Sequence, residues 1–490
     1  MTWITEDQKM LADTIDAYVA KHIAPYAAEW DANHHFPVDE MRGLAELGVG
    51  ALYCSEDHGG TGLTRSDGVV VFNRIARGCP VTSAFLSIHN MVTWMVDEFG
   101  TEEQRAEFVP RLASMEVLGS YCLTEPDAGS DAASLSTRAV KDGDEWVLDG
   151  VKQFISGAGA SDVYLVMART GAEGAKGISA FLVDKGTPGL SFGPNEKKMG
   201  WRNQPTAQVM FDGVRIPADR LIGGEEGLGK GFTMAMRGLN GGRINIAACA
   251  LGGAEFAFGR AVSYLRDRKA FGGTLIDNDA LRHRIADMAA GLQSSRLMLS
   301  HAANALDTKA PGYPEACAMA KLHVTETCFR VADEALQLHG GYGYLEEYDV
   351  ERIVRDLRVM RILEGTNEIM RTSVTSAAAR TSATVSYGRR RLICAHVGGM
   401  RPTLPSRQPS SSVIGRNQPV DDASEVSPSA IWPSGCAATK KKVSKRTGKD
   451  SGVTQLPHGR TRSERTPRFS SCMKSENASS FDSRAFRCAW

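Results

Sequence analysis

The spacing of apolar residues changes twice along this chain, and this limits the possible folds more than any other feature. From residue 5 to about 116, apolar residues recur at helical spacing, as in Leu11, Ile15 and Val19. Between about residues 119 and 221 the apolar period shortens to that of strands. Long helical patterns then return after a Gly-rich stretch. This order predicts an α+β protein with a helical N-terminal domain, a central β-barrel-like domain and a C-terminal four-helix bundle.

The expected domain boundaries follow these changes in period. We predict an N-terminal helical domain over residues 1–118, a middle β domain over 119–222 and a helical bundle over 223–371. A basic tail rich in Ser and Arg occupies residues 372–490. Each of four patterns is long enough for one bundle helix: 232–268, 279–308, 314–338 and 349–363.

Two Asp-Gly pairs of the middle domain, Asp149-Gly150 and Asp212-Gly213, each lie between apolar runs. These pairs therefore predict the turns of two β-hairpins. Residues 163–168 and 178–183 have the composition of further strands.

The net charge of zero hides a strong difference between two parts of the chain. The 490 residues, 42% of them hydrophobic, can bury a large core. Residues 372–490, however, contain 20 Lys+Arg and 7 Asp+Glu, a net charge of +13, whereas residues 1–371 carry −13. The tail lacks sustained periodicity and cannot repay its ordering entropy, so we expect it to be disordered. Its basic run 440–446 is interpreted as solvated, and no nucleic-acid partner is expected.

The cysteines and the N-terminus indicate an intracellular protein. Six cysteines before residue 372 show no ligand-like spacing, which predicts buried thiols and neither disulfides nor a metal site. Thr5 and Gln8 have the spacing of a capping box. No signal segment, transit segment or membrane-spanning run is present in the sequence. We therefore expect a cytoplasmic location and no membrane partner.

Glu364 is the first candidate for chemistry. It follows the apolar residues Ile362 and Leu363 and precedes Gly365-Thr366-Asn367. A carboxylate in poorly solvated surroundings should have a raised pKa, as a base for a weak carbon acid requires. The plain alternative is a surface Glu near a helix end.

The helical, β, helical order, together with a Glu before Gly-Thr-Asn, resembles the acyl-CoA dehydrogenase family over residues 1–371. The resemblance implies α,β-dehydrogenation of an acyl-CoA thioester, with Glu364 as the catalytic base and FAD as the cofactor. It also implies a homotetramer that passes electrons to an electron-transfer flavoprotein. No metal is implied.

A polar segment at the start of the β domain carries part of this resemblance. Residues 121–131 offer hydroxyls and backbone N–H groups near a Gly, which suit a heteroaromatic ring and a thioester. By resemblance, the Thr124 hydroxyl bonds the flavin and Ser130 also contacts CoA. Phe154 and Ser156 stand where the family commonly has Trp and Thr. The flavin contacts implied here are Tyr121, Leu123, Thr124, Gly129, Ser130, Phe154, Ile155 and Ser156.

Two further segments resemble those that hold the rest of FAD. Arg268 resembles the arginine that pairs with the pyrophosphate from a neighbouring subunit, although a basic residue after a helix is usually solvated. The glycines of residues 337–341 could equally form a simple helix C-cap. No strand leads into them, so they do not form a Rossmann cradle. The contacts implied are Arg268, Phe271, Asn278, Asp279, Gln337, Leu338, His339, Gly340, Gly341, Thr366, Asn367 and Glu368.

Residues 239–246 are interpreted as a substrate-binding segment that opens a bundle helix. The alternative role of Asn240 is a helix cap. Some relatives carry the catalytic Glu at the position of Gly242, so its absence here supports Glu364. The substrate contacts implied by resemblance are Ser130, Asn240, Gly241, Gly242 and Arg243, the last holding CoA.

Among family members, the chain most resembles those that convert isobutyryl-CoA to methacrylyl-CoA in valine degradation. Short straight-chain or 2-methylbutyryl-CoA stays open as a substrate, because one methylene changes binding by only about 1 to 3 kcal/mol. An acyl-CoA oxidase, or a protein that retains the fold without turnover, is a further alternative. Impaired catalysis is another alternative, because the resemblance to the family ends at residue 371.

Overall fold

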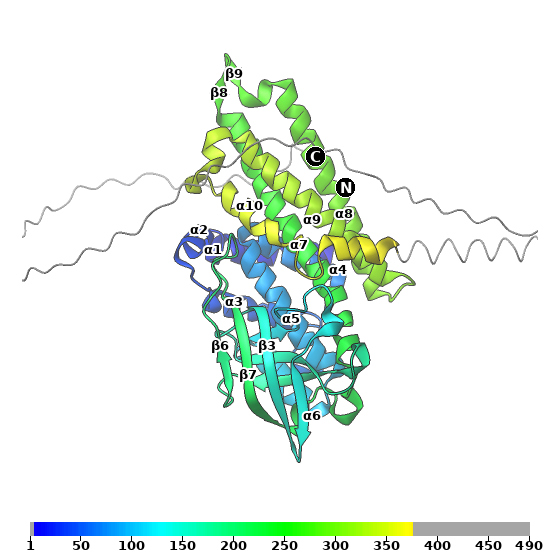
Figure 1. The fold of residues 1–490 in the computed structure, drawn as a ribbon. Helices are drawn as coiled ribbons and strands as arrows, with labels where there is room; N and C mark the ends of the chain where they lie inside the picture. The colour runs from blue at the N-terminus through cyan, green and yellow to red at the C-terminus, as the bar shows by residue number, and fades with distance from the viewer. Residues whose placement is uncertain (1–3, 376–490) are drawn as a thin grey trace, which may run out of the picture. The chain divides into compact units, whose positions relative to one another are not determined.

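The structure, a computed structural model, describes residues 4–375 of the chain (Figure 1). It contains N-terminal helices, a curled sheet and a C-terminal helical bundle, as the change in apolar period predicts. The predicted disorder of the tail concerns mostly residues 376–490, which lie outside the described residues.

The N-terminal part is helical, as predicted. Hydroxyl residues cap three of its helices, and the expected box of Thr5 with Gln8 is confirmed, since each side chain bonds the other's backbone N–H. Thr64 and Thr101 form equivalent boxes at later helices. The helices are α1 (Glu6–His22), α2 (Ala27–Asn33), α3 (Val38–Ala45), α4 (Arg65–Gly78), α5 (Pro80–Phe99) and α6 (Glu102–Ala113).

The middle part is one seven-stranded sheet. Its order is β1-β4-β2-β3-β7-β6, and β5 also pairs with β4. The strands predicted at 163–168 and 178–183 are confirmed as β4 and β5, which are antiparallel. The strands are β1 (Gly119–Cys122), β2 (Arg138–Asp142), β3 (Glu145–Ser156), β4 (Val163–Arg169), β5 (Ile178–Asp184), β6 (Leu190–Phe192) and β7 (Thr206–Pro217).

The two predicted Asp-Gly hairpins are wrong. Asp149-Gly150 lies inside β3 and Asp212-Gly213 inside β7, and these long strands pair with each other. The register shifts there, so Asp149 alone lies opposite Asp212 and Gly213 in a β-bulge. Asp149 Oδ1 accepts a hydrogen bond from the Gly213 N–H at 2.8 Å. The Asp-Gly pairs therefore bend a strand pair, and the nearby turn is formed by Gly143 between β2 and β3.

A second bulge lies at the end of β3 that approaches the predicted flavin segment. Gln153 and Phe154 together face Gln208 of β7. Phe154 adopts a left-handed φ of 59°, and the residue is 64% exposed. The bulge thus turns one aromatic side chain out of the sheet.

The C-terminal bundle follows the predicted patterns closely. Its helices are α7 (Gly231–Asp267), α8 (Asp279–Asp307), α9 (Tyr313–Leu338) and α10 (Val350–Val359), with a short β8–β9 hairpin (Lys269–Ala270, Gly273–Thr274) after α7. α7 contacts the other three bundle helices and also α4 and α5 (Figure 1). Because its buried residues lie on several faces, α7 is the central helix of the described part.

The helix after Glu364 crosses the expected start of the tail. Residues 367–375 are helical, so residues 372–375, which composition places in the tail, continue an ordered element. Thr372 and Ser373 donate their hydroxyls to the carbonyls of Glu368 and Ile369, one turn earlier. Such bonds to the preceding turn give these hydroxyls an acceptor within the helix.

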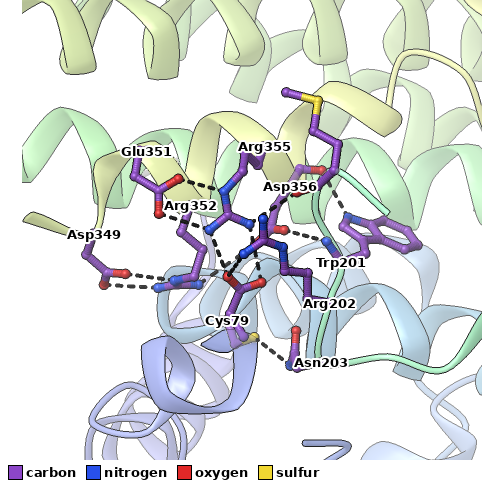
Figure 2. Close-up of polar contacts among 11 residues, drawn as sticks. Cys79, Trp201, Arg202, Asn203, Asp349, Glu351, Arg352, Arg355 and Asp356 are labelled. Carbon is purple, nitrogen blue, oxygen red and sulfur yellow. Dashed lines mark hydrogen bonds and ion pairs between the residues drawn. The ribbon is translucent and has the colours of Figure 1, made fainter. Parts of the chain in front are cut away.

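α10 is tied to two other parts of the fold by a polar cluster (Figure 2). The backbone N–H of Trp201, in the loop between β6 and β7, donates to Asp356 Oδ1 at 2.7 Å, and its indole N–H donates to the Asp356 carbonyl. Arg355 donates to Asp31 of α2 at 2.7 Å. Glu351 accepts from the same guanidinium. The cluster therefore holds the helix that leads to Glu364.

The six cysteines of the described part are free and buried, so the prediction of buried thiols is confirmed. Within residues 4–375 no group of three or more His, Cys, Asp or Glu side chains is placed to hold a metal ion. None of the helices in this range is long and apolar enough to cross a membrane.

Candidate active site

Glu364 lies in a tight turn between α10 and the helix of residues 367–375. Its φ is 59° and that of Gly365 is 87°, so two successive residues are left-handed. A non-glycine residue in this region stores backbone strain and needs support from its surroundings. The carboxylate Oε2 is shielded from solvent and has no hydrogen-bond partner among the described residues. Burial raises the Glu364 pKa to about 7, which confirms the predicted direction.

The Glu364 carboxylate packs against α7. A Cβ atom added at Gly242 would lie 2.5 Å from Glu364 Oε2. At Gly241 it would lie 2.5 Å from the guanidinium of Arg65. The two glycines therefore make room for two charged groups, and one of them is the predicted base.

Arg243 supports the turn from the same helix. Its Nε donates to the backbone carbonyl of Glu364 at 3.2 Å, and its Nη1 donates to Asn240 Oδ1 at 2.9 Å. Asn240 lies inside α7, so the expectation that this segment opens a bundle helix is wrong, and the alternative of Asn240 as a helix cap is excluded. Arg243 and Asn240 instead form one polar unit beside the turn.

Lys321 of α9 is a part of the site that sequence reasoning missed. The side chain is fully buried, and its ammonium donates to the Gly365 carbonyl at 2.8 Å and to Asn367 Oδ1 at 2.9 Å. Burial lowers the Lys321 pKa to about 8, although Glu364 favours the charged form. Its position on the buried side of α9, four residues after Cys317, is a sequence signal that could have identified it.

Asn367 faces the protein interior. Besides accepting from Lys321, its amide donates to Thr325 Oγ1 and to Glu326 Oε1, both at 3.0 Å. Only 1% of the residue is exposed. The Asn367 side chain thus joins the turn to α9, whereas its predicted role was a contact to FAD.

The polar segment after β1 approaches the same site. Burial, with Glu364 as a second cause, raises the Tyr121 pKa well above its usual value, and the Tyr121 hydroxyl has no partner among the described residues. The Gln153 N–H donates to the Thr124 carbonyl at 2.8 Å. This bond connects the β1 segment to the bulge that exposes Phe154.

A buried ion pair fixes the backbone of this segment. Lys152 Nζ donates to Glu125 Oε1 at 2.8 Å and to the Leu123 carbonyl at 3.1 Å. Sequence reasoning missed both charged residues. The flanking positions differ in exposure: Ile155 is buried, whereas Gly129 and Ser130 lie in an open loop.

Arg268, predicted for the pyrophosphate, and residues 337–341, predicted as further FAD contacts, form a second group around a cavity of about 480 Å³. A Cβ at Gly340 or Gly341 would meet no atom within 4 Å, so both glycines border open space. The Arg268 guanidinium lies 5.6 Å from the Tyr342 ring and forms no ion pair within residues 4–375. The remaining predicted residues that line this cavity are Gln337, Leu338 and His339.

The other predicted cofactor residues lie around these two groups. Phe271 is fully exposed near the β8–β9 hairpin. Asn278 caps α8 through its side-chain oxygen, and Asp279 pairs with Arg282. Thr366 accepts from the Ile369 N–H at the start of the last helix. Glu368 and Ser156 are placed differently: Glu368 is exposed, and the Ser156 carbonyl accepts from Ser120.

Comparison with known protein families shows to which family the chain belongs. The N-terminal domain model of acyl-CoA dehydrogenase matches residues 5–116, the middle domain model matches 120–214 and the C-terminal domain model matches 229–379. The chain belongs to the acyl-CoA dehydrogenase family. It is therefore an FAD-dependent oxidoreductase with acyl-CoA dehydrogenase activity.

Individual members are similar over most of their length. Mitochondrial isobutyryl-CoA dehydrogenase of Bos taurus is 50% identical over 368 residues, 75% of this chain and 88% of the relative. The mitochondrial short-chain specific enzyme of the same species is 40% identical over 370 residues, 75% of this chain and 89% of the relative. The structure of butyryl-CoA dehydrogenase from Megasphaera elsdenii matches with a TM-score of 0.74 at 34% identity, covering 77% of this chain and 99% of that one.

The residues of this acyl-CoA dehydrogenase fit the cofactor of its family. The cavity beside Arg268 offers a cation without an ionic partner in the described part, and the glycines allow close approach of the backbone. A planar guanidinium and accessible backbone N–H groups are suited to a pyrophosphate. Phe154 offers a second, aromatic surface at the bulge.

Proposed function

We propose that the chain oxidises isobutyryl-CoA to methacrylyl-CoA, a step of valine degradation, with Glu364 as the base. The observation that carries the assignment of the base is the shielded Glu364 carboxylate above Gly242. The choice of substrate is supported by similarity, since identity to the bovine isobutyryl-CoA enzyme is 50% and to the bovine short-chain enzyme 40%.

The surroundings of Glu364 suit removal of a proton from carbon. A solvated carboxylate is a weak base towards a thioester α C–H, and burial increases its basicity. With a pKa of about 7, Glu364 is still ionised in a large fraction of molecules at neutral pH. Its free Oε2 can accept the proton without first breaking a hydrogen bond.

The other residues bind and orient the reactants. FAD, when bound, accepts the hydride that leaves the β carbon. We assign the flavin ring to the surface of Thr124 and Phe154, and the pyrophosphate to Arg268 and the glycines at 340 and 341. Arg243 holds the turn of Glu364, and in this proposal it also lies near the CoA moiety.

We further propose a homotetramer that passes electrons to an electron-transfer flavoprotein. Phe271 is fully exposed and Tyr344 is 81% exposed, although both rings are largely apolar. Covering them would remove apolar surface from water. The exposed side chains near the Arg268 cavity therefore support a subunit interface close to the cofactor.

The test is anaerobic bleaching of the flavin by a panel of short acyl-CoAs. We expect the full-length protein to bleach fastest with isobutyryl-CoA. Glu364→Gln should bind this thioester without bleaching, because the neutral amide cannot accept the proton. Glu226→Gln, at an exposed carboxylate, serves as the matched control and should bleach like the unmodified protein.

Each alternative gives a different result. Faster bleaching by butyryl-CoA or 2-methylbutyryl-CoA would identify that thioester as the preferred substrate. Bleaching by Glu364→Gln at the rate of the unmodified protein would contradict the assignment of Glu364 as the base. Peroxide release in air, without an artificial acceptor, would indicate an oxidase. An FAD-saturated protein that no acyl-CoA bleaches would indicate impaired catalysis or a binding function.

A further inference from the structure

The turn that carries Glu364 is held by two cations from two different helices. Arg243 of α7 donates to the carbonyl of Glu364, and Lys321 of α9 donates to the next carbonyl, that of Gly365. These are the two residues with left-handed φ angles. The two donors therefore bond to the strained part of the backbone.

The ammonium of Lys321 needs hydrogen-bond partners because its side chain is fully buried. Removing an ammonium from water costs several kcal/mol unless partners compensate. The structure gives it two acceptors, one on the turn and one on Asn367. Asn367 is in turn held by Thr325 and Glu326. Lys321 is thus the centre of a network that connects α9 to the turn.

A merely structural anchor at this position would not need a charge. A neutral donor such as a glutamine amide could also bond a carbonyl. The positive charge, however, faces Glu364, which has no hydrogen-bond partner at Oε2. An opposite charge nearby favours the ionised form of a buried carboxylate.

We propose that Lys321 is a positioning residue for the dehydrogenation: its ammonium fixes the turn backbone, and its charge keeps Glu364 ionised. This inference rests on the proposed role of Glu364 as the base. Lys321 acts through Glu364 and is not assigned a contact with substrate or flavin.

Several other charged or titratable groups face this pair and affect its titration. Arg243 favours the ionised form of Glu364, as Lys321 does. Glu326 and Glu368 favour the charged form of Lys321, and Arg243 opposes it. The groups that face the pair are Arg243 of α7, Glu326 of α9, Tyr121 of β1 and Glu368 of the last helix.

The test compares the pH dependence of bleaching by isobutyryl-CoA in the unmodified protein, Lys321→Gln and Lys321→Met. For Lys321→Gln we expect the apparent pKa of the bleaching rate to rise by about one unit or more, because one neighbouring charge is lost. At pH 7 a shift of one unit from about 7 lowers the ionised fraction of Glu364 and therefore the rate by about fivefold, with the change in kcat and little change in KM. Lys321→Met should show the same shift and a further loss of rate, since it also frees the turn.

Two other variants separate charge from hydrogen bonding. Lys321→Arg should return the apparent pKa towards that of the unmodified protein, because the charge is retained. Asn367→Ala should lower the rate without the pKa shift, because the charge remains while one acceptor is removed. If Lys321→Met fails to fold or to hold FAD, Lys321→Gln and Asn367→Ala still decide between the two roles.

Arg296→Met is the matched control. Arg296 of α8 is a partly buried cation that pairs with Glu255 at 2.7 Å, and Glu255 lies about 18 Å from Arg243 along α7. This variant should lower the melting temperature without moving the apparent pKa.

The outcomes for Lys321 and for the base are distinguishable. A folded, FAD-loaded Lys321→Gln protein with the unmodified apparent pKa and rate would overturn the inference while leaving Glu364 as the base. Bleaching by Glu364→Gln would instead overturn the proposed base itself.

Discussion

Replacing Gly242 by alanine tests whether the position of the Glu364 carboxylate matters for the rate. The added Cβ would lie 2.5 Å from Oε2, 2.8 Å from Cδ and 3.0 Å from Oε1. Ordinary contact begins at 3.4 Å, so the carboxylate must move by about 1 Å. The turn cannot easily follow, because Arg243 and Lys321 hold its carbonyls.

The expected cost falls on the rate more than on stability. A displacement of about 1 Å at a catalytic group can cost about 100-fold in rate, or roughly 2.7 kcal/mol in the activation barrier. The atoms that must move form the end of a flexible side chain. Alanine in place of glycine in a helix also stabilises by about 0.5 to 1 kcal/mol. We therefore expect Gly242→Ala to fold with little loss of stability and to bleach about 100-fold more slowly.

The assay is stopped-flow bleaching by isobutyryl-CoA, with thermal unfolding measured on the same samples. Gly259→Ala is the control on the same helix, since a Cβ there would meet no atom within 4 Å. It should gain the helix stabilisation and keep the unmodified rate. Bleaching by Gly242→Ala within about threefold of the unmodified rate would refute the reasoning, because the clash predicts a much larger loss.

Three further predictions concern stability and assembly. The Glu364 pKa is raised in the folded state, so ionisation of Glu364 lowers the unfolding free energy as pH rises from about 4.5 to 7. At pH 8, Glu364→Gln should therefore raise the urea midpoint, which corresponds to an increase of up to roughly 3 kcal/mol in unfolding free energy. At pH 4 the midpoint should change little. An equal shift of the urea midpoint at pH 4 and pH 8 would contradict the predicted pH dependence. Asp356→Ala leaves the Trp201 N–H without its buried acceptor and should cost about 1 to 3 kcal/mol in urea unfolding, so an unchanged midpoint would argue against the cluster. Phe271→Ser should weaken the proposed tetramer and FAD retention in light scattering and absorbance, whereas an intact, yellow tetramer would exclude this side chain from the interface.

Helical periodicity predicted the bundle well because it reports which face of a helix is buried. The pattern at 314–338 corresponds to α9 within one residue at its start. The last pattern, 349–363, extends four residues beyond α10, because Leu363 continues the apolar face although the chain has already entered the turn. Apolar spacing cannot detect a change of backbone direction that tertiary contacts impose.

The Asp-Gly error has a similar cause. Gly213 needs a left-handed φ, which is common to hairpin turns and to bulges. Only the partner strand distinguishes them, and β7 lies far from β3 in sequence. Gly143, which forms the actual turn, has the same local chemistry.

The buried charges around the turn were the least predictable part of the site. A single lysine in a helix is usually solvated, and no local pattern shows that Lys321 meets Gly365, which is 44 residues later. Asn367 was expected at the cofactor for the same reason, since its sequence position does not reveal that its side chain points inward. Glu364 itself became a candidate through its apolar neighbours, although Ile362 is 50% exposed, and its role as the base came from the family resemblance.

The pairing of β3 with β7 has a consequence for the order of folding. Ser156 pairs with Thr206 and Glu145 with Pro217, so these contacts close long loops, whereas the helices form from local ones. Joining β7 to β3 should therefore be a late and slow step, and it also forms the bulge that exposes Phe154. A newly synthesised chain would then acquire the aromatic surface proposed for the flavin only after residues 206–217 have docked, and cofactor capture would follow sheet closure.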